Sequence, residues 1–193
     1  MHLFEYLETS ERNLVIEKHF FKDEIIFQEE EKCEYLSLIK EGFIKISTYL
    51  KTGNEVIYKE VKTGDFFGNN LLFSSSPFYK GNVICLEDTT LLLIKKNDLL
   101  KVLQENRNFL LHYLLLGSDQ SKKQNEMIKI LSIESLEERF ITYLEISSGE
   151  ITLDSIANLS SKLRVRRETL SRLISKLVKE KIIEKKKNKI VLL

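Results

Sequence analysis

Four polar residues near the C-terminal end have the types and the spacing needed to read DNA bases. Arg167, Glu168, Ser171 and Arg172 stand at i, i+1, i+4 and i+5, so one helix would carry them as a single patch. Arginine can donate two hydrogen bonds to guanine, glutamate can accept one from cytosine, and serine can do either. The patch therefore predicts base readout, and an exposed Arg/Glu face that only stabilises its own helix is the alternative.

The elements around this patch predict a winged helix-turn-helix. In a helix over 167–179, an apolar stripe lies opposite the patch and is expected to be buried; it comprises Leu170, Leu173, Ile174, Leu177 and Val178. A shorter helix, capped by Asp154 or Ser155, should end at about Leu163, and 164–166 form the turn. Residues 182–184 and 189–193 flank 185–188 like a two-stranded wing.

The charge distribution agrees with a nucleic-acid partner. The whole chain carries 30 basic and 29 acidic residues, but residues 162–193 hold 12 basic and only 3 acidic ones. We call residues 162–193 the basic C-terminal tip. Its charge favours double-stranded DNA as a partner, although a solvated lysine-rich tail would have the same composition. We expect contacts to the DNA backbone from Lys162, Arg164, Arg166, Lys176, Lys186 and Lys187.

The first half of the chain has a strand-like pattern. Short apolar runs with turn signals between them extend over 24–94 and predict an antiparallel β-roll or barrel. The expected strands are 24–27, 35–39, 43–49, 55–61, 81–86 and 90–94. A helix is expected over 3–21, before the first of them.

From Asn97 onward the apolar period becomes helical. Asn97 or Asp98 can cap a short helix, and a longer helix is expected from Arg107 to Ile130. The first half of the longer helix is apolar nearly all round, which predicts pairing with a second copy of the chain; packing on the β domain alone is the alternative. The predicted dimer contacts are Phe109, Tyr113, Leu116 and Met127.

We therefore expect an α+β protein with three parts. A β-roll sensor domain spans 1–105, a dimerisation helix spans 106–131, and a winged helix-turn-helix domain spans 132–193. A helix over 135–144 should open the last domain with a capping box, in which Ser135 precedes Glu138 by three residues.

The segment 159–172, LSSKLRVRRETLSR, resembles the helix-turn-helix of the cyclic-AMP receptor protein/FNR (Crp/Fnr) family of bacterial transcription regulators. Residues 24–28, 35–47 and 64–68 (GDFFG) look like the β-roll signature of that family, and Arg139 sits where the family has an arginine. The resemblance covers almost the whole chain. It implies a homodimer that binds a pseudo-palindromic operator, with Glu168 and Arg172 as principal base readers and a TTGAT-like half-site.

Two positions of the turn depart from the family pattern. Arg164 replaces the glycine of the turn, and Arg166 replaces the serine that would cap the recognition helix. These changes either distort the turn or add phosphate contacts. Ser160 stays small, as the close approach of the two helices requires.

The sensor half also departs from the family. The resemblance places an effector pocket at Gly68, Asn69, Leu71, Lys80, Gln124 and Asn125. The family holds the ribose of cyclic AMP with a glutamate and the phosphate with an arginine, but Asn69 replaces the acid and residues 67–81 contain no arginine. Cyclic AMP is therefore not expected to bind. Lys80 could offer only a point charge to an anion.

Other cofactors are not expected either. The two cysteines, Cys33 and Cys85, are too few for an iron–sulfur cluster, and no residue spacing suggests a metal site. His2, His19 and His112 follow no haem-binding arrangement. The thiolate of Cys33 should be disfavoured by the surrounding glutamates. Any effector is thus an unassigned small molecule, or there is none.

The sequence lacks the features that are typical of enzymes, membrane proteins and secreted proteins. No nucleophile–base pair or phosphate-binding glycine loop is visible, so we expect no enzyme. No apolar run approaches the length of a membrane helix, and the N-terminus shows no secretory pattern, so a cytoplasmic protein without a membrane partner is expected. RNA polymerase is a possible further partner. The competing function is a small-molecule sensor or interaction module whose DNA-binding half has decayed.

Overall fold

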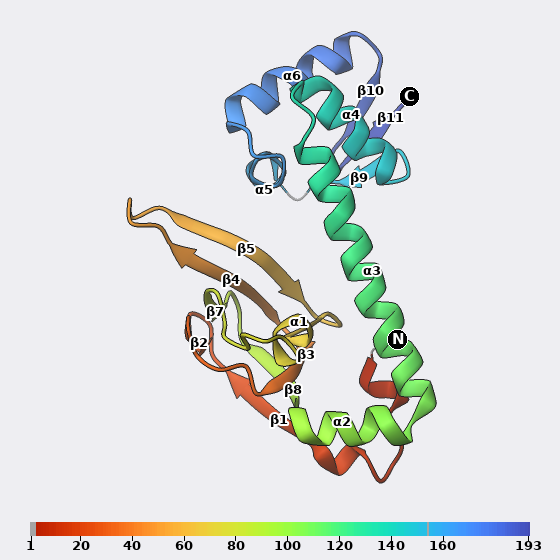
Figure 1. Ribbon diagram of the computed structural model, residues 1–193. Helices are drawn as coiled ribbons and strands as arrows, with labels where there is room; N and C mark the ends of the chain where they lie inside the picture. Colours follow the sequence, from red (N-terminus) through yellow and green to blue (C-terminus); the bar gives the residue numbers. More distant parts are fainter. Residues whose placement is uncertain (1–2, 154) are drawn as a thin grey trace. The chain divides into compact units, whose positions relative to one another are not determined.

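A computed structural model describes residues 3–153 and 155–193 of the chain (Figure 1). The chain divides into two compact units, Met1–Gly117 and Ser118–Leu193. Their boundary falls within the long helix that the sequence predicts as a separate dimerisation element. The three-part division at 1–105, 106–131 and 132–193 stays a prediction.

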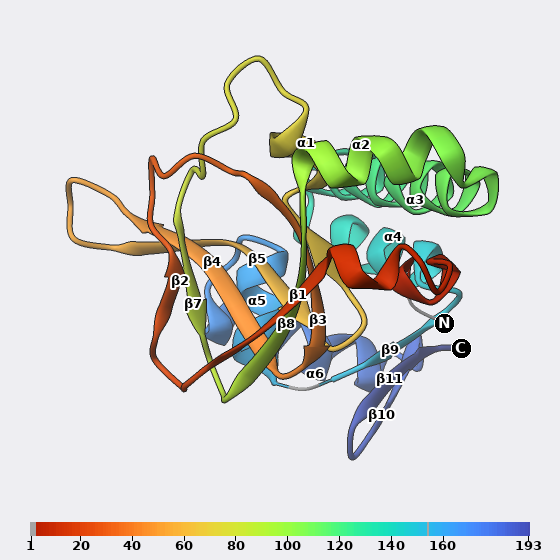
Figure 2. The same cartoon turned by 90° about the horizontal axis from the view of Figure 1, so that it is seen from below.

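The first unit is a β-roll built from two four-stranded sheets in which every paired strand is antiparallel (Figure 2). The strand orders are β1-β8-β3-β6 and β2-β7-β4-β5. The strands are β1 Val15–Phe20, β2 Ile25–Phe27, β3 Tyr35–Glu41, β4 Phe43–Tyr49, β5 Glu55–Lys62, β6 Phe66–Phe67, β7 Asn82–Cys85 and β8 Thr89–Lys95. The α+β class and all six predicted strands are confirmed.

The helix expected over 3–21 is wrong. Two short 3-10 helices, Leu3–Tyr6 and Arg12–Leu14, precede β1, which pairs with β8 from Val15↔Ile94 to Phe20↔Thr89. The side chains of β1 are mostly exposed, so its sequence lacks the apolar alternation of a half-buried strand. The partner strand therefore determines its conformation, which the local sequence does not show. Strand β6 was missed because it has only two residues.

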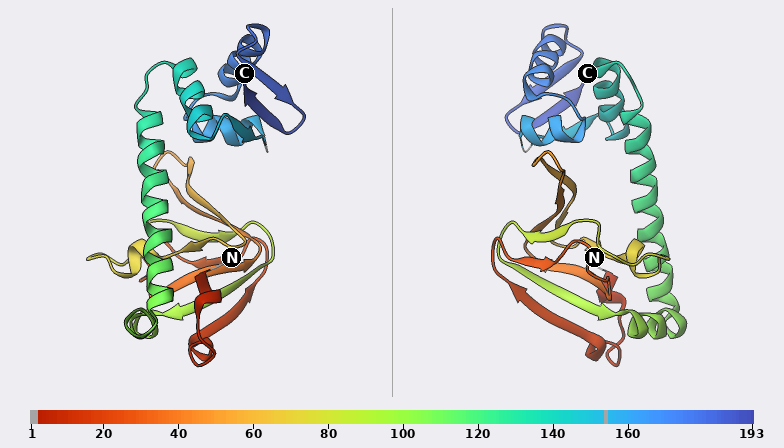
Figure 3. Two further views of the ribbon diagram at one scale, coloured as in Figure 1. Left: turned by 90° about the vertical axis from the view of Figure 1, so that its right-hand side faces the viewer. Right: turned by 60° about the vertical axis from the view of Figure 1, so that its left-hand side comes forward.

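Three helices complete this part of the chain: α1 Asn69–Leu72, α2 Lys96–Glu105 and α3 Arg107–Leu131. Figure 3 shows α3 as one continuous helix. The N-cap of α2 is Lys95 and gives no side-chain cap, so capping by Asn97 or Asp98 is wrong. Asn106, between α2 and α3, accepts a hydrogen bond from the Phe109 amide at 2.9 Å and donates to the Tyr6 carbonyl at 2.9 Å. This buried amide fixes the start of α3 to the N-terminal segment.

The second unit contains helices α4 Leu136–Ile146, α5 Ile156–Lys162 and α6 Arg167–Lys179, and a three-stranded antiparallel sheet of order β10-β11-β9. Its strands are β9 Glu150–Thr152, β10 Ile183–Lys186 and β11 Lys189–Leu192. The hairpin β10–β11 confirms the predicted wing. Strand β9 is not among the predicted elements, because its three residues are too few to show a strand pattern.

The predicted caps of this unit are largely observed. The Ser135 hydroxyl accepts a hydrogen bond from the Glu138 amide at the start of α4, and the Ser155 hydroxyl accepts one from the Asn158 amide at the start of α5. Asp154, the other candidate cap of α5, lies outside the described residues.

Each unit has its own apolar core. The core of the first unit runs from Leu3 to Phe109 along the sequence, and that of the second from Ile130 to Ile190, with no residue in common. In the described part of the chain, every helix is too short or too polar to cross a lipid bilayer.

Candidate nucleic-acid interface

Helix α6 separates an apolar face from a polar one. Leu170, Ile174 and Leu177 are buried, and Leu173 is half-buried against the same core. Val178 was expected in this stripe, but it is 39% exposed, because the helical period places it at the edge of the buried face. The stripe fixes the rotation of the helix about its axis.

The predicted base-reading residues lie on the opposite, wet face. Arg167, Glu168 and Arg172 are exposed and Ser171 is half-buried. All four belong to the first two turns of α6, which is the end that enters the major groove in helix-turn-helix proteins. The structure thus brings together two guanidinium groups, a carboxylate and a hydroxyl on one rigid surface.

The turn before α6 keeps a standard geometry although Arg164 replaces glycine. The Arg164 amide donates to the Ser161 carbonyl at 3.1 Å, and the Val165 amide donates to the Ser160 carbonyl at 3.0 Å. This is the Schellman pattern that ends a helix with a left-handed residue, and Arg164 has a φ of 51°. The turn is therefore not distorted. The turn has a cost in free energy, because a non-glycine residue is held in the left-handed conformation that glycine adopts freely.

Replacing Arg164 with glycine is expected to raise the free energy of unfolding of the second unit by about 1 kcal/mol, because it removes this conformational cost. Thermal or urea unfolding measures the change. Arg164→Ala is the matched control, since it removes the same charge but keeps a Cβ atom, and it should bring no such gain. Equal free energies of unfolding for Arg164→Gly and Arg164→Ala would show that the backbone at Arg164 is not strained.

Arg139 of α4 binds three backbone carbonyls on two other segments of this unit. Its guanidinium donates to the Ile133 carbonyl at 2.6 and 2.9 Å, to the Glu134 carbonyl at 3.4 Å and to the Leu163 carbonyl at 3.0 Å. The first two carbonyls precede α4 and the third ends α5. Arg139 therefore holds the first helix of the helix-turn-helix against the segment that joins α3 to α4.

The six predicted phosphate-contacting cations are all exposed, but they are not equally free. Arg166 is the N-cap of α6 and gives no side-chain cap, as its replacement of serine predicts. Lys176 forms an ion pair with Glu137 at 2.7 Å, and the hydrogen bond within that pair raises the pKa of Lys176. Lys186 lies 3.1 Å from Glu184. Lys162, Arg164, Arg166 and Lys187 thus present the charge that is least compensated within the chain.

Three of the predicted pocket residues, Gly68, Asn69 and Leu71, lie at α1. Gly68 precedes this helix with a φ of 89°, and a Cβ atom there would lie 2.7 Å from the Tyr35 carbonyl oxygen. Asn69 and Leu71 are half-buried, and the ammonium of Lys80 lies 3.5 Å from the carboxylate of Glu30. Gly68 is therefore required for the fold whether or not an effector binds.

The other two residues of the predicted pocket belong to the second unit. Gln124 and Asn125 are both exposed on α3. Their participation in an effector site with residues of the first unit stays a prediction.

Both cysteine thiols are buried. Burial is the main cause that raises the pKa of Cys33 and of Cys85, so both are held as thiols. The pKa of Cys33 is thus raised, as the sequence predicts. Of its acidic neighbours only Glu34 contributes, and its contribution is smaller than that of burial.

The predicted dimer residues need one revision. Phe109 is completely buried in the core of its own unit, 6.4 Å from the Phe4 ring centre, so it is not available to a partner chain. Tyr113 and Leu116 also pack against that core, and Met127 is half-buried. The water-exposed apolar residues of α3 are Leu111, Leu114, Leu115 and Ile128. The apolar pattern of the sequence alone could not distinguish the two faces, because both are apolar.

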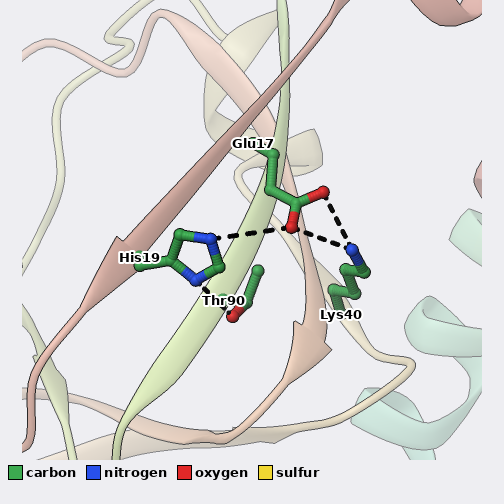
Figure 4. Close-up of polar contacts among 4 residues, drawn as sticks. All are labelled: Glu17, His19, Lys40 and Thr90. Carbon is green, nitrogen blue, oxygen red and sulfur yellow. Dashed lines mark hydrogen bonds and ion pairs between the residues drawn. The ribbon is translucent and has the colours of Figure 1, made fainter.

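One further polar cluster has the residue types of a catalytic triad (Figure 4). His19 Nδ1 lies 2.9 Å from the hydroxyl of Thr90, and His19 Nε2 lies 3.7 Å from Glu17, which also binds Lys40 at 2.8 Å. The imidazole side chain is 74% exposed on the edge strand β1, so water is not excluded from it. These contacts connect β1, β8 and β3 and give no support for an active site.

Comparison with known proteins gives a consistent result. The family description "cyclic nucleotide-binding domain" matches residues 17–106. The chain is 30% identical over 129 residues to the anaerobic regulatory protein of Bacillus subtilis (strain 168), which covers 67% of this chain and 52% of that protein. The chain thus spans about half the length of this curated relative.

Solved structures share the fold along the whole chain. FixK2 from Bradyrhizobium japonicum is 23% identical with a TM-score of 0.64, and the match covers 92% of each chain. A CooA mutant from Carboxydothermus hydrogenoformans is 18% identical with a TM-score of 0.76, and the match covers 100% of this chain and 91% of that one. At these identities the likeness establishes the architecture.

Proposed function

Because the chain belongs to the Crp/Fnr family of transcriptional regulators, we propose that it is a sequence-specific DNA-binding regulator that acts as a homodimer on a pseudo-palindromic operator. One observation carries the proposal: Arg167, Glu168 and Arg172 are exposed at the N-terminal end of α6, while Leu170, Ile174 and Leu177 anchor its opposite face. This arrangement presents base-reading groups on a rigid helix.

Two copies of α6, one per subunit, would enter successive major grooves about 34 Å apart. The exposed leucines of α3 supply an apolar surface for pairing, and Asn125 on the same helix could fix the register of the pair. A regulator of this kind acts on chromosomal DNA, so we place it in the cytoplasm and regard RNA polymerase as a candidate partner.

The proposed regulator does not depend on cyclic AMP. Asn69 offers no carboxylate to a ribose, and Lys80 is already near Glu30. Calorimetric titration of the full chain with cyclic AMP tests this part, and saturable binding in the micromolar range would refute it. We propose neither an iron–sulfur cluster nor a metal, and no catalytic function.

Selection of bound DNA from a random pool tests the main proposal. We expect an enriched inverted repeat, with a half-site related to TTGAT. If selection recovers no inverted repeat, the proposal fails. The competing function, a sensor with a decayed DNA-binding half, is favoured only by Arg164 and Arg166 at the turn. It predicts no steep salt dependence of DNA affinity, whereas a DNA binder loses affinity strongly as salt increases.

Arg172→Ala and Glu168→Ala are each expected to weaken binding of the selected site by about 1–3 kcal/mol and to relax specificity at one base pair. The reason is that each change removes hydrogen bonds to one base edge. Titrations of each protein variant with single-base variants of the selected site measure the loss of affinity and of specificity. Uniform weakening on all sequences, with specificity kept, would assign these residues to the DNA backbone instead.

Lys187→Ala is expected to weaken binding to the selected and to unrelated DNA alike, and to lower the salt dependence by about one released counterion. Lys186→Ala should have a smaller effect, because Glu184 already lies 3.1 Å from its ammonium group. Titrations over a range of salt concentrations compare the two. A base-specific loss in Lys187→Ala would contradict a phosphate contact.

A further inference from the structure

A hollow of about 520 Å³ opens on the first unit at the start of α2, and its lining contains none of the residues predicted for DNA binding or for the effector pocket. Its walls come from the residues just before β3, from Leu72 and Pro77, and from the junction of β8 with α2. This volume lies in the range of small-molecule sites.

Positive charge dominates the lining of this hollow. Four lysines, Lys32, Lys95, Lys96 and Lys101, face two acids, Glu34 and Asp98. Lys32 lies 3.7 Å from Glu34, so these two charges offset one another. Within the described part of the chain, the other three lysines form no ion pair with a carboxylate.

The backbone adds to this charge. Helix α2 has ten residues, and its N-cap, Lys95, supplies no side-chain acceptor for the first amide groups. A helix N-terminus carries partial positive charge, so lysines are unfavourable there in the absence of an anion. Lys96 is also held in place, with its ammonium group 5.4 Å from the centre of the Phe73 ring.

We propose that this hollow binds a phosphoryl dianion, either inorganic phosphate or the phosphate group of a small metabolite. Lys95, Lys96 and Lys101 neutralise the charge, and the amide groups of Asn97 and Asp98 donate hydrogen bonds, since the Lys96 amide already donates to the Glu34 carbonyl at 3.0 Å. Leu72 and Pro77 provide an apolar wall for the rest of a phosphate ester. Asp98 is the only acid of the lining left to oppose three unpaired lysines. The site is independent of the proposed DNA binding.

Amide NMR spectra of the full chain, titrated at constant ionic strength without DNA, test the site. The probes are inorganic phosphate and glycerol 3-phosphate. We expect saturable shifts of the Asn97, Asp98 and Leu99 amides with either probe. This residue-resolved signal separates the hollow from the basic C-terminal tip, which also attracts phosphate. Tighter binding of glycerol 3-phosphate identifies a phosphate ester as the ligand, and equal binding identifies the free ion.

The triple variant Lys95→Gln, Lys96→Gln and Lys101→Gln is expected to weaken binding at least about tenfold, because the charge-assisted contacts are lost. The matched control replaces Lys18, Lys22 and Lys51, three exposed lysines outside the hollow, with glutamine. It removes the same charge and should retain the affinity. Equal weakening in both variants, or no saturable shift of the α2 amides in the wild-type protein, would overturn the proposal.

Discussion

Replacing both Leu111 and Leu115 with glutamate is expected to convert the protein to a monomer and to weaken operator binding by about 10²–10⁴-fold. These leucines are 53% and 55% exposed and stand one helical turn apart on α3. A subunit interface that buries them would have to desolvate two carboxylates per chain after the substitution, at a high cost in free energy.

The loss of DNA affinity follows from the loss of pairing. A dimer binds its second half-site at the high effective concentration set by the first, and a monomer does not. Sedimentation gives the oligomeric state, and titration of the selected operator gives the affinity. Leu100→Glu is the matched control, because Leu100 is an exposed leucine on α2 rather than α3. A double variant that stays dimeric would show that another surface holds the subunits together.

Arg139→Met is expected to lower the free energy of unfolding of the second unit by about 3 kcal/mol. Hydrogen bonds from a charged donor contribute about 1.5–3 kcal/mol each, but those made by one side chain are not additive. Methionine keeps most of the apolar stem, so the change isolates the hydrogen bonds to Ile133, Glu134 and Leu163.

Hydrogen exchange of the full chain measures this effect where it should occur. Amides of α5 and of the turn at Arg164 are expected to lose protection, while those of the β-roll keep theirs, because Arg139 contacts only the second unit. Arg107→Met, at an exposed arginine, is the control. Unchanged protection of α5 in Arg139→Met would show that the apolar core alone holds these helices together.

The recognition helix was predictable because two independent patterns coincide in it. Its bounds, Arg167–Lys179, agree with the prediction, since Leu170, Ile174 and Leu177 mark the buried face and the charged residues the other. The β-roll strands between 24 and 94 were predictable for a similar reason. Short apolar runs and glycine-containing turns define them locally.

The errors arise where distant residues decide the structure. Strand β1 takes its conformation from pairing with β8, whose residues lie 69 to 79 positions later (Phe20↔Thr89 to Val15↔Ile94), and its own residues are mostly exposed. Phe109 carries the same apolar signal whether it packs in its own core or in a dimer. The left-handed conformation of Arg164 was also not readable from its residue type, because arginine rarely adopts it.

The separation of the two apolar cores has a consequence for how the protein denatures. Because no buried apolar residue belongs to both cores, the first and second units can lose their structure in separate steps. Calorimetry should then resolve two heat-absorption peaks. Arg139→Met would lower the temperature of the peak of the second unit only. A phosphate bound at α2 would raise the temperature of the peak of the first unit only.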